Sequence, residues 1–553
     1  MPVPSNLSDT FARYSLRRNP REQEFLKKGL WKGRLLVDIV DGHAMANPER
    51  VVIIDGETAL TYGEVRRRTE SLAGSFTQLG VGPGDIVAIQ SPNWSELPLT
   101  HLALDRIGAI FLPLHDGFRD AELTHLLRLT KARVFIHPRF FHRFDYRELA
   151  EKIAPQLPDL RTRIVMRDSP AAGELGFDGL SGSRGGGPSS VPSGARSTHP
   201  SLIMVSSGTT GMPQCSVFCD DAVSIKLIEQ YNSAVNLSIH DRGAAIAPAG
   251  TGTTGYNYPI LGALLNGATS VLLERWNGQE PVEALRLIQR HQCTYAVVIP
   301  TQLVKMVHAA RANAISCSSL RFITYAGAKL APQVAKEAES IFGCPVQCVY
   351  GASDAGVPVM TTISDSPEKR RTAGRVLPGE EVRLIGPEGQ EVAQGETGEV
   401  CWRGANSGFG YLKQENADAV DCQDQAWHRS GDLGAFDSEG YLSIVGRKKD
   451  MIIRGGRNIN PGKIEEVLLQ FDKVLEVAII PFDDLVLGEI VCAVVVPADP
   501  EAPPTLDELC HFISEAGLGV WYAPERLHVV SDLPRNAGGK TDKRALIQRF
   551  GRS

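Results

Sequence analysis

Apolar and polar positions along most of the chain follow the pattern of strands and helices in alternation. Val51 to Ile54 is a short apolar run that predicts a buried strand. Thr61 and Glu64 form a capping box that predicts the start of a helix, and Ile86 to Ile89 predicts the next strand. The same reasoning predicts helices at residues 97–106 and 221–232, and strands at residues 109–114, 202–205, 244–247, 295–300, 322–325 and 348–350.

The pattern changes in the last third of the chain. Residues 380–402 alternate apolar and polar positions around glycine-containing turns, as a small antiparallel sheet does. Residues 463–471 predict a helix, and residues 474–480 and 490–496 predict strands. We therefore predict the α/β class: a large N-terminal domain of several subdomains, with mostly parallel sheets and a small β-rich part, followed by a small α+β C-terminal domain.

Two segments differ from this pattern. Residues 1–35 are polar and basic with a few aromatics, so we expect an irregular arm lying over the main body. Residues 169–200 are so rich in Gly, Ser and Pro that we expect a flexible surface loop without a core of its own. The whole chain of 553 residues is too long for one ordinary core, which predicts two or more domains or subdomains.

Charge and cysteine content exclude some classes of partner. The net charge of −6 is spread without long runs of one sign, so we expect neither a nucleic-acid partner nor a membrane surface. The ten cysteines are scattered, and we interpret them as small buried side chains in a reducing compartment rather than as a zinc site. The N-terminus lacks the apolar core of a signal peptide, and we expect a cytoplasmic protein.

A candidate phosphate-binding loop follows the strand predicted at residues 202–205. Glycine lets backbone N–H groups approach an anion closely, and hydroxyl groups add donors without bulk. No Walker A string can be written through this loop, and on its own it is equally compatible with an ordinary turn. The loop consists of Ser206, Ser207, Gly208, Thr209, Thr210 and Gly211.

Further motifs follow this loop in a fixed order. They are Tyr350-Gly351-Ala352-Ser353-Asp354, then Ser430-Gly431-Asp432, then the charged residues 446–450, and then residues 534–540, which end in Gly538-Gly539-Lys540. This order and spacing resemble the adenylate-forming superfamily of acyl- and aryl-CoA synthetases, adenylation domains of nonribosomal peptide synthetases and luciferases. The resemblance runs from about Thr58 to Leu546 and covers nearly the whole chain.

The resemblance implies a site for ATP, Mg²⁺ and a carboxylic acid. The loop from Ser206 to Gly211 would hold the β- and γ-phosphates, and Lys540 would swing in as a point charge between the carboxylate and the α-phosphate. The remaining expected roles are Asp354 as the Mg²⁺ ligand, Ser353 at the α-phosphate, Tyr350 on the adenine, Asp432 at the ribose hydroxyls, Arg447 near the ribose and phosphate, and Gly327, Ala328 and Gly351 against the adenine and the acyl group.

The resemblance also places the acid pocket at Tyr256 and Asn257. Aryl-acid adenylating enzymes carry an Asn at the position of Asn257, where amino-acid-activating domains carry an Asp. A neutral amide cannot neutralise an amine, so an acid without an α-amino group is favoured. A polar loop residue that bonds its own backbone is the alternative reading. The small residues at 250–255 are expected to leave room for a large substrate.

Two domains and a hinge are expected from the same resemblance. Residues 1–445 would form the adenylation domain, residues 446–450 with Lys449 the hinge, and residues 451–553 a mobile domain that carries Lys540. After rotation of that domain, Gly455 and Gly456 would line the thiol path. The thiol would come from coenzyme A or from the phosphopantetheine of an acyl carrier protein, and the protein would be a monomer or homodimer.

Three departures from the family pattern concern the phosphate and metal side. Gln214-Cys215 replaces the usual Lys-Gly, Asp354 replaces Glu, and Ser353 replaces Thr.

We predict an ATP-dependent acid–thiol ligase for an aromatic or bulky apolar acid. Two alternatives stay open: an enzyme of one half-reaction, either adenylation or thioester formation, and a non-catalytic acyl-nucleotide binding protein.

Overall fold

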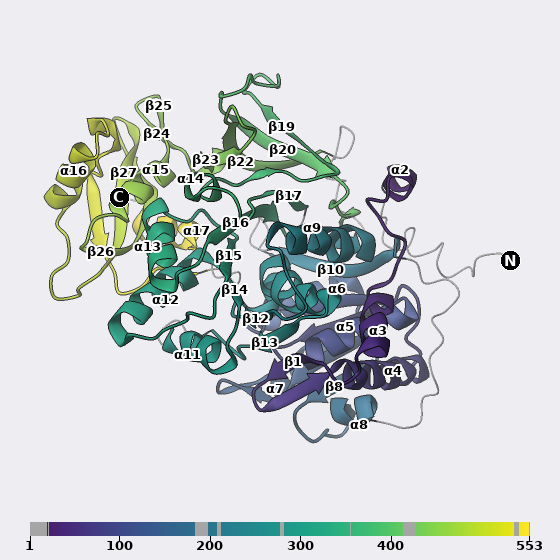
Figure 1. Ribbon diagram of the computed structural model, residues 1–553. Helices are drawn as coiled ribbons and strands as arrows, with labels where there is room; N and C mark the ends of the chain where they lie inside the picture. The colour runs from purple at the N-terminus through teal and green to yellow at the C-terminus, as the bar shows by residue number, and fades with distance from the viewer. Residues whose placement is uncertain are drawn as a thin grey trace.

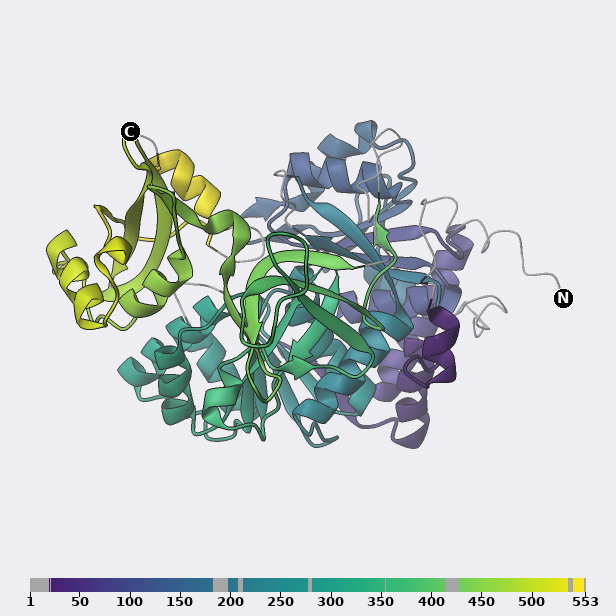
Figure 2. The same cartoon turned by 90° about the horizontal axis from the view of Figure 1, so that it is seen from above.

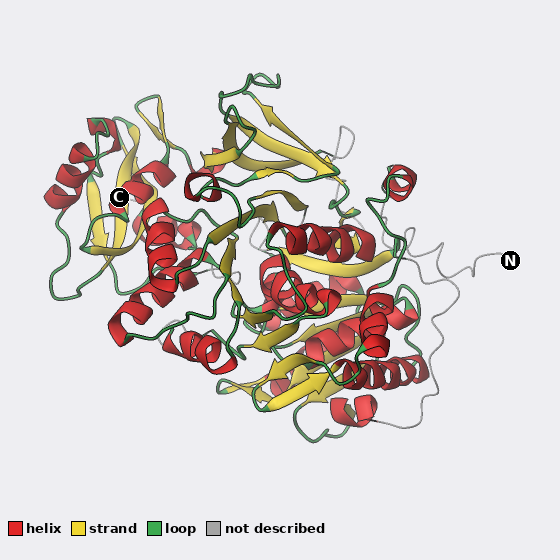
Figure 3. Cartoon of the chain, viewed as in Figure 1, coloured by secondary structure: helices red, strands yellow, loops and turns green. Residues whose placement is uncertain are grey.

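The computed structural model describes residues 19, 21–182, 197–206, 212–276, 281–353, 355–412, 427–535 and 541–551. Helices lie against large sheets in the body of the molecule, and the part that contains the C-terminus forms one end of it (Figure 1, Figure 3). The predicted α/β class is confirmed. Among the described residues, no helix has the length and apolar character needed to cross a membrane.

One large sheet has eight strands and a parallel centre. It confirms the strands predicted at residues 86–89, 109–114 and 202–205. In the order in which they lie side by side, the strands are β21 (Gly410–Tyr411), β11 (Gln214–Cys219), β10 (Pro200–Ser206), β4 (Ile110–Leu114), β3 (Ile86–Gln90), β5 (Val134–Pro138), β8 (Thr162–Met166) and β9 (Glu174–Gly176).

A second sheet has nine strands, and it too is parallel in its centre and antiparallel at its edges. Most of its strands were predicted from apolar runs. In spatial order they are β18 (Arg375–Val376), β17 (Gly356–Met360), β16 (Val346–Ala352), β15 (Phe322–Ala326), β14 (Tyr295–Val298), β12 (Arg242–Ala245), β13 (Thr269–Leu272), β1 (Val51–Asp55) and β2 (Thr58–Thr61).

The largest core cluster combines residues of both sheets with residues of the helices packed between them. Thr61 caps the first of these helices and forms the predicted capping box with Glu64. The second runs from Glu96 to Ile107, and all of its residues are buried. The helices of the body are α3 (Leu36–Ala46), α4 (Tyr62–Gln78), α5 (Glu96–Ile107), α6 (Asp120–Thr130), α7 (Tyr146–Ile153), α8 (Phe177–Gly182), α9 (Leu227–Ala234), α10 (Gly262–Asn266), α11 (Val282–His291), α12 (Pro300–Asn313), α13 (Pro332–Phe342) and α14 (Pro367–Arg370).

Two smaller sheets follow. The antiparallel sheet predicted at residues 380–402 is confirmed, and the last sheet is built only from residues after 451. The first contains β19 (Glu380–Ile385), β20 (Gly398–Gly404), β22 (His428–Phe436) and β23 (Leu442–Arg447); the second contains β25 (Arg457–Ile459), β24 (Ile452–Arg454), β27 (Gly488–Pro497), β26 (Val474–Asp484) and β28 (Arg526–Val529), with helices α15 (Pro461–Leu468), α16 (Leu506–Glu515) and α17 (Lys543–Phe550).

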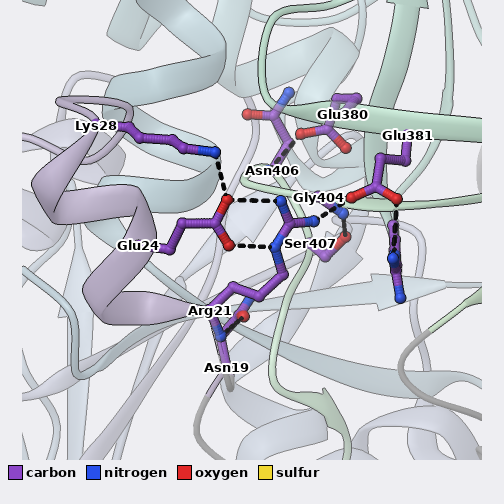
Figure 4. Close-up of polar contacts among 10 residues, drawn as sticks. Asn19, Arg21, Glu24, Lys28, Glu380, Glu381, Gly404, Asn406 and Ser407 are labelled. Carbon is purple, nitrogen blue, oxygen red and sulfur yellow. Dashed lines mark hydrogen bonds and ion pairs between the residues drawn. The ribbon is translucent and has the colours of Figure 1, made fainter.

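The N-terminal segment is more ordered than its composition predicts. Residues Glu22–Lys27 form helix α2, and Phe25 and Trp31 are buried in a small cluster of their own. Arg21 donates to Glu24 at 2.8 Å and is also paired with Glu381 of β19 (Figure 4). The expectation of an irregular arm is therefore wrong for Glu22–Lys27, whereas residues 28–35 form neither helix nor strand and lie against the body, as expected.

The flexible loop predicted at residues 169–200 is wrong for Glu174 to Gly182. Residues 183–196 lie outside the described residues, but β9 and α8 occupy Glu174 to Gly182. Phe177 is fully buried, and the hydroxyl groups of Ser71 and Ser75 both donate to the carbonyl of Leu180 at 3.0 Å. These contacts attach the segment to α4, which the Gly- and Ser-rich composition did not reveal.

Two segments adopt π-helices, which the sequence did not predict. Asp220–Lys226 forms π-helix η2, so the helix expected at residues 221–232 starts with a wider turn before α9. Thr253–Leu261 forms π-helix η4, directly after a short 3₁₀ turn, η3 (Ala249–Thr251). Such π-turns are rare and are frequent at functional sites.

The C-terminal sheet and its helices lie beside the body (Figure 2), and ion pairs join the two parts. Lys329, just after β15, is 2.6 Å from Glu466 of α15. Lys305 of α12 is 3.9 Å from Glu476 of β26, which also pairs with Arg535. The C-terminal part therefore contacts the body beside α12 and the loop after β15.

Candidate active site

Tyr350, Asp432 and Arg447 meet although they come from three different strands. The Tyr350 hydroxyl donates to Asp432 Oδ2 at 2.8 Å, and Arg447 Nε donates to Asp432 Oδ1 at 2.8 Å. Asp432 and Arg447 are cross-strand partners in β22 and β23, which explains their contact. Burial raises the pKa of Tyr350 above its ordinary value, so its hydroxyl stays protonated and keeps donating.

This cluster fits the expected nucleotide site. Each oxygen of Asp432 has accepted one hydrogen bond from protein, and a carboxylate oxygen can accept a second. Ribose hydroxyl groups could donate to the remaining positions, and Arg447, with its side chain 46% exposed, keeps guanidinium donors for a phosphate. The residues that we assigned to ribose, base and phosphate are thus neighbours in space.

The turn between β16 and β17 requires close backbone packing. A Cβ at Gly351 would lie 2.4 Å from the carbonyl oxygen of Gly356, so no larger residue fits there. Ser353 follows in the same turn, and its Oγ would be 3.5 Å from a Cβ at Gly252. Since Gly252 immediately precedes η4, the candidate phosphate contact and the candidate acid pocket are adjacent.

The loop after β15 is open to solvent. Gly327 has a φ of 94°, which favours glycine, and Gly327 and Ala328 are both exposed. Lys329, next in the chain, pairs with the C-terminal part, as described above. The two small residues are therefore accessible to a ligand, as expected for residues that lie against a nucleotide or an acyl group.

Asn257 is fully buried and is held on one side only. Its Nδ2 donates to the carbonyl oxygen of Val223 in η2 at 3.2 Å. Its Oδ1 is buried and has no hydrogen-bond partner among the described residues, and the same holds for Ser224 Oγ, one residue beyond Val223. A buried acceptor without a partner is costly, so this amide is suited to a ligand that donates a hydrogen bond.

Tyr256 lies differently from its neighbour. Its ring is 1% exposed, and its hydroxyl is 3.0 Å from Nδ1 of His101 in α5. The hydroxyl is thus occupied by protein, and the side chain packs between α5 and β4 rather than presenting a free donor to an acid. His101 was not identifiable from the sequence, because 155 residues separate it from Tyr256.

The small residues at 250–255 do not all leave space. A Cβ at Gly250 would lie 2.5 Å from Cα of His115, so this glycine permits close packing of two backbone segments. The expectation that small side chains leave room for a large acid is therefore wrong for Gly250. The space that a side chain would occupy there is already filled.

The expected hinge and thiol-path residues lie at the start of the C-terminal part. Lys449 is exposed in a 3₁₀ turn, η5 (Lys448–Asp450), between β23 and β24. Gly455 and Gly456 form the turn of the β24–β25 hairpin with φ values of 54° and 80°, which favour glycine at both positions. Gly455 N–H donates to the carbonyl oxygen of Leu487, so the hairpin is attached to the C-terminal sheet.

Several predicted residues fall outside the described part of the chain: Ser207 to Gly211, Asp354 and Lys540. Ser206 is the last residue of β10 and is paired with Gln214, the first residue of β11. The two ends of the candidate phosphate-binding loop thus lie opposite each other. The roles of these residues remain predictions.

Comparisons with known proteins agree with this arrangement. Residues 40–412 match the family described as AMP-binding enzyme, and residues 463–540 match the AMP-binding enzyme C-terminal domain. The chain is 31% identical to the salicyl-AMP ligase / salicyl-S-ArCP synthetase of Mycobacterium tuberculosis, over 96% of this chain and 93% of that protein. It is 30% identical to the 2,3-dihydroxybenzoate-AMP ligase of Bacillus subtilis, over 95% of each.

A solved structure shows the same fold at low identity. The anthranilate CoA ligase AuaEII in complex with anthranoyl-AMP superposes with a TM-score of 0.85 at 22% identity, covering 94% of this chain and 97% of that one. The two family matches lie in both parts of the chain, and the first includes the motif that carries Tyr350. The chain therefore belongs to the AMP-binding enzyme family.

Proposed function

We propose that the protein activates a ring-hydroxylated aromatic carboxylic acid as its acyl-AMP and then transfers the acyl group to a phosphopantetheine thiol. The observation that carries the proposal is the buried, unpartnered Oδ1 of Asn257. Because Asn257 Nδ2 already donates to Val223, the amide offers an acceptor, and a phenolic hydroxyl is a matching donor. An ammonium group would find no carboxylate at this residue.

The names of two relatives support the same class of acid. One relative is called a salicyl-AMP ligase and another a 2,3-dihydroxybenzoate-AMP ligase, and both names denote acids with a hydroxyl group on the ring. The charged groups around Asp432 suit the second substrate, ATP. We assign the ribose to Asp432, the adenine to Tyr350 and a phosphate contact to Arg447.

The chemistry proceeds in two steps. A carboxylate oxygen of the acid attacks the α-phosphorus of ATP, a C–O–P bond forms, and the bond to pyrophosphate breaks. Both reactants are anions, and we assign the cation between them to Lys540. A thiol then loses its proton, its sulfur attacks the acyl carbon, and AMP leaves as the thioester forms. Mg²⁺, held by Asp354 in our assignment, would neutralise phosphate charge.

The acceptor thiol has two possible sources with the same chemistry. Coenzyme A and an acyl carrier protein both end in phosphopantetheine, and relatives are named for each: a salicyl-S-ArCP synthetase and an indoleacetate–CoA ligase. We assign the path of this arm to Gly455 and Gly456 after rotation about Lys449. A cytoplasmic location is part of the proposal, and the nine described cysteines, all free, are compatible with it.

Pyrophosphate release with Mg-ATP tests the proposal. The panel contains 2-hydroxybenzoate, 2,3-dihydroxybenzoate, benzoate and a fatty acid, with Lys540→Ala as the control. We expect release with the hydroxylated acids and loss in the variant. Coenzyme A and a phosphopantetheinylated aryl carrier protein then serve as separate acceptors.

Three outcomes would favour the alternatives. If no acid gives pyrophosphate release but synthetic acyl-AMP and thiol are converted rapidly, the protein is an enzyme of the thioester half-reaction. Tight binding of acyl-AMP without turnover in either direction, unchanged by Lys540→Ala, would show a binding protein. Adenylation without transfer to either thiol would confine the protein to the first half-reaction.

A further inference from the structure

His101 is a polar residue inside a helix that is otherwise part of the main core. It lies on α5, which is buried between the two large sheets, and its ring stacks on Phe111 of β4 with centroids 4.4 Å apart and planes 12° from parallel. One ring nitrogen, Nδ1, is 3.0 Å from the Tyr256 hydroxyl, and Nε2 has no hydrogen-bond partner among the described residues. The contact with Tyr256 is thus the polar interaction that the fold provides for this ring.

The state of this histidine is fixed by its surroundings. Burial lowers the pKa of His101 to about 3, so the ring is neutral near pH 7. A neutral ring carries one N–H group, and Nδ1 either donates to the Tyr256 oxygen or accepts from its hydroxyl. In both cases the hydrogen bond is between uncharged groups in a dry environment, where its loss leaves a buried polar atom unpaired.

The π-helix that carries Asn257 is attached to the core through both neighbours of that residue. Tyr256 bonds to His101 on one side. Tyr258 packs on Tyr231 with ring centroids 4.4 Å apart, and the Tyr231 hydroxyl is 2.9 Å from Thr324 Oγ1 of β15. The backbone of η4 contains Pro259, which cannot donate a backbone hydrogen bond, so side-chain contacts are needed to fix this turn.

Resting on the proposed contact between Asn257 and the acid, we propose that His101 is a positioning residue for acid recognition. Its hydrogen bond with Tyr256 fixes the first half of η4 and thereby sets the direction in which Asn257 presents Oδ1. The hydrogen bond between His101 and Tyr256 therefore matters for acids that carry a ring hydroxyl group, because only these acids donate to Asn257 Oδ1. Tyr350, Asp432 and Arg447, which we assign to ATP, lie on other elements, so we expect the effect on the acid alone.

The competing explanation is that His101 only fills the core. The variants that separate the two are His101→Phe, Tyr256→Phe, the double variant of these, Asn257→Ala, and each of the first two changes combined with Asn257→Ala. The probe is pyrophosphate release with Mg-ATP and 2-hydroxybenzoate, with KM measured for each substrate. Tyr441→Phe is the matched control, because it removes another hydrogen-bonded tyrosine hydroxyl, which lies next to β23 and donates to Asp365 Oδ1 at 2.9 Å.

If His101 positions Asn257, its loss should change the KM for the acid but not the KM for ATP. His101→Phe and Tyr256→Phe should each raise the KM for 2-hydroxybenzoate about 5- to 20-fold, the usual range for losing one buried hydrogen bond, and leave the KM for ATP unchanged. The double variant should be no worse than either single one, because both remove the same bond. In the Asn257→Ala background neither change should raise the KM for the acid further.

A second readout does not depend on turnover. Hydrogen exchange of the backbone amides of residues 253–261 should be faster in His101→Phe and Tyr256→Phe than in the wild type, and unchanged in Tyr441→Phe. If these amides exchange as in the wild type, or if folded Tyr256→Phe has an unaltered KM for the acid while Asn257→Ala has a raised one, the inference is wrong. If Asn257→Ala itself leaves the KM for the acid unchanged, the proposed acid contact fails instead.

Discussion

At the scale of single residues, acid recognition depends on Asn257. We expect Asn257→Leu, which keeps the volume and removes the acceptor, to lower kcat/KM for 2-hydroxybenzoate about 10- to 100-fold through one lost hydrogen bond in a dry site. Benzoate lacks the hydroxyl donor and serves as the matched control, so its kcat/KM should change little. Equal losses for both acids would mean that Asn257 shapes the pocket without reading the hydroxyl group.

Glu380 gives a residue-scale prediction about pH. It is buried at the start of β19, and burial raises its pKa from 4.5 to about 8, against the opposing effect of the hydrogen bond from Asn406 N–H. Between these two pH values the folded chain keeps a proton that the unfolded chain releases. The contribution of Glu380 to stability is therefore complete below about pH 4.5 and is lost as the pH rises to about 8.

Glu380→Gln tests this predicted loss of stability with rising pH. The variant cannot ionise, so its thermal midpoint should fall less than that of the wild type as the pH is raised from 5 to 8. The control is Glu381→Gln on the neighbouring exposed face, which pairs with Arg403 and Arg21. A wild type that becomes more stable across this range because of Glu380 would contradict the assignment.

Residues in the candidate site were predictable where a motif carries them. Tyr350, Asp432 and Arg447 were named from the sequence, and the structure places them in one hydrogen-bonded cluster. His101 and Val223 were not, because their contacts with Tyr256 and Asn257 depend on how distant segments pack. A motif identifies the residues that we assign to the ligand, whereas the residues behind them are determined by the fold.

At the scale of elements, the N-terminal segment is the clearest difference between expectation and structure. Its composition predicted an irregular arm, yet Trp31 is buried and its Nε1 donates to the carbonyl oxygen of Ala405 at 2.8 Å. Lys32 N–H and Gly33 N–H donate to the buried carboxylate of Asp221 at the start of η2. The sequence pattern did not predict this attachment, because it depends on a few aromatic side chains that follow no helical repeat.

We expect Trp31→Phe to destabilise the protein through the unpaired carbonyl of Ala405, by about 1–2 kcal/mol or several degrees in thermal midpoint. Arg21→Gln is the comparison within the same segment. Arg21 is partly exposed in its ion pairs with Glu24 and Glu381, so its loss should cost less than about 1 kcal/mol. The opposite ranking of the two variants would show that the outer ion pairs (Figure 4) hold the segment.

Helices and strands with a regular repeat were predicted well, and the π-helices were not. The helix opened by Thr61 and the strands β3, β14 and β15 lie where apolar runs place them. Residues 253–261 contain Gly, Asn, Tyr and Pro without a helical period, and only their packing between α5, α9 and β14 gives η4 its turn. Residue propensities do not predict a π-helix whose backbone conformation is determined by tertiary contacts.

At the scale of the whole molecule, the proposed two-step reaction requires the C-terminal part to turn relative to the body. Lys329 and Glu466 join the two parts at 2.6 Å, and both side chains are accessible. We expect that Lys329→Cys and Glu466→Cys, linked by a short bis-maleimide, hold the protein in this one arrangement. The linked protein should keep one half-reaction and lose thioester formation from acid, ATP and thiol by at least about 10-fold.

The single-cysteine variants, treated with the same reagent, are the controls for modification. Eight of the nine described cysteines are buried, which favours selective linkage at the introduced sites. Full turnover in the linked protein would mean that both steps proceed without rotation about residues 448–450. The hinge assigned to Lys449 would then be withdrawn.

The central claim is that the protein makes an acyl-adenylate, and mass spectrometry of the product tests it most directly. The protein is incubated with Mg-ATP and 2-hydroxybenzoate in the absence of any thiol, and the bound and released nucleotides are analysed. We expect the 2-hydroxybenzoyl adenylate in the wild type and its absence in Lys540→Ala. ATP consumption without an adenylate, or no adenylate from any hydroxylated aromatic acid while synthetic acyl-AMP and thiol react readily, would contradict it.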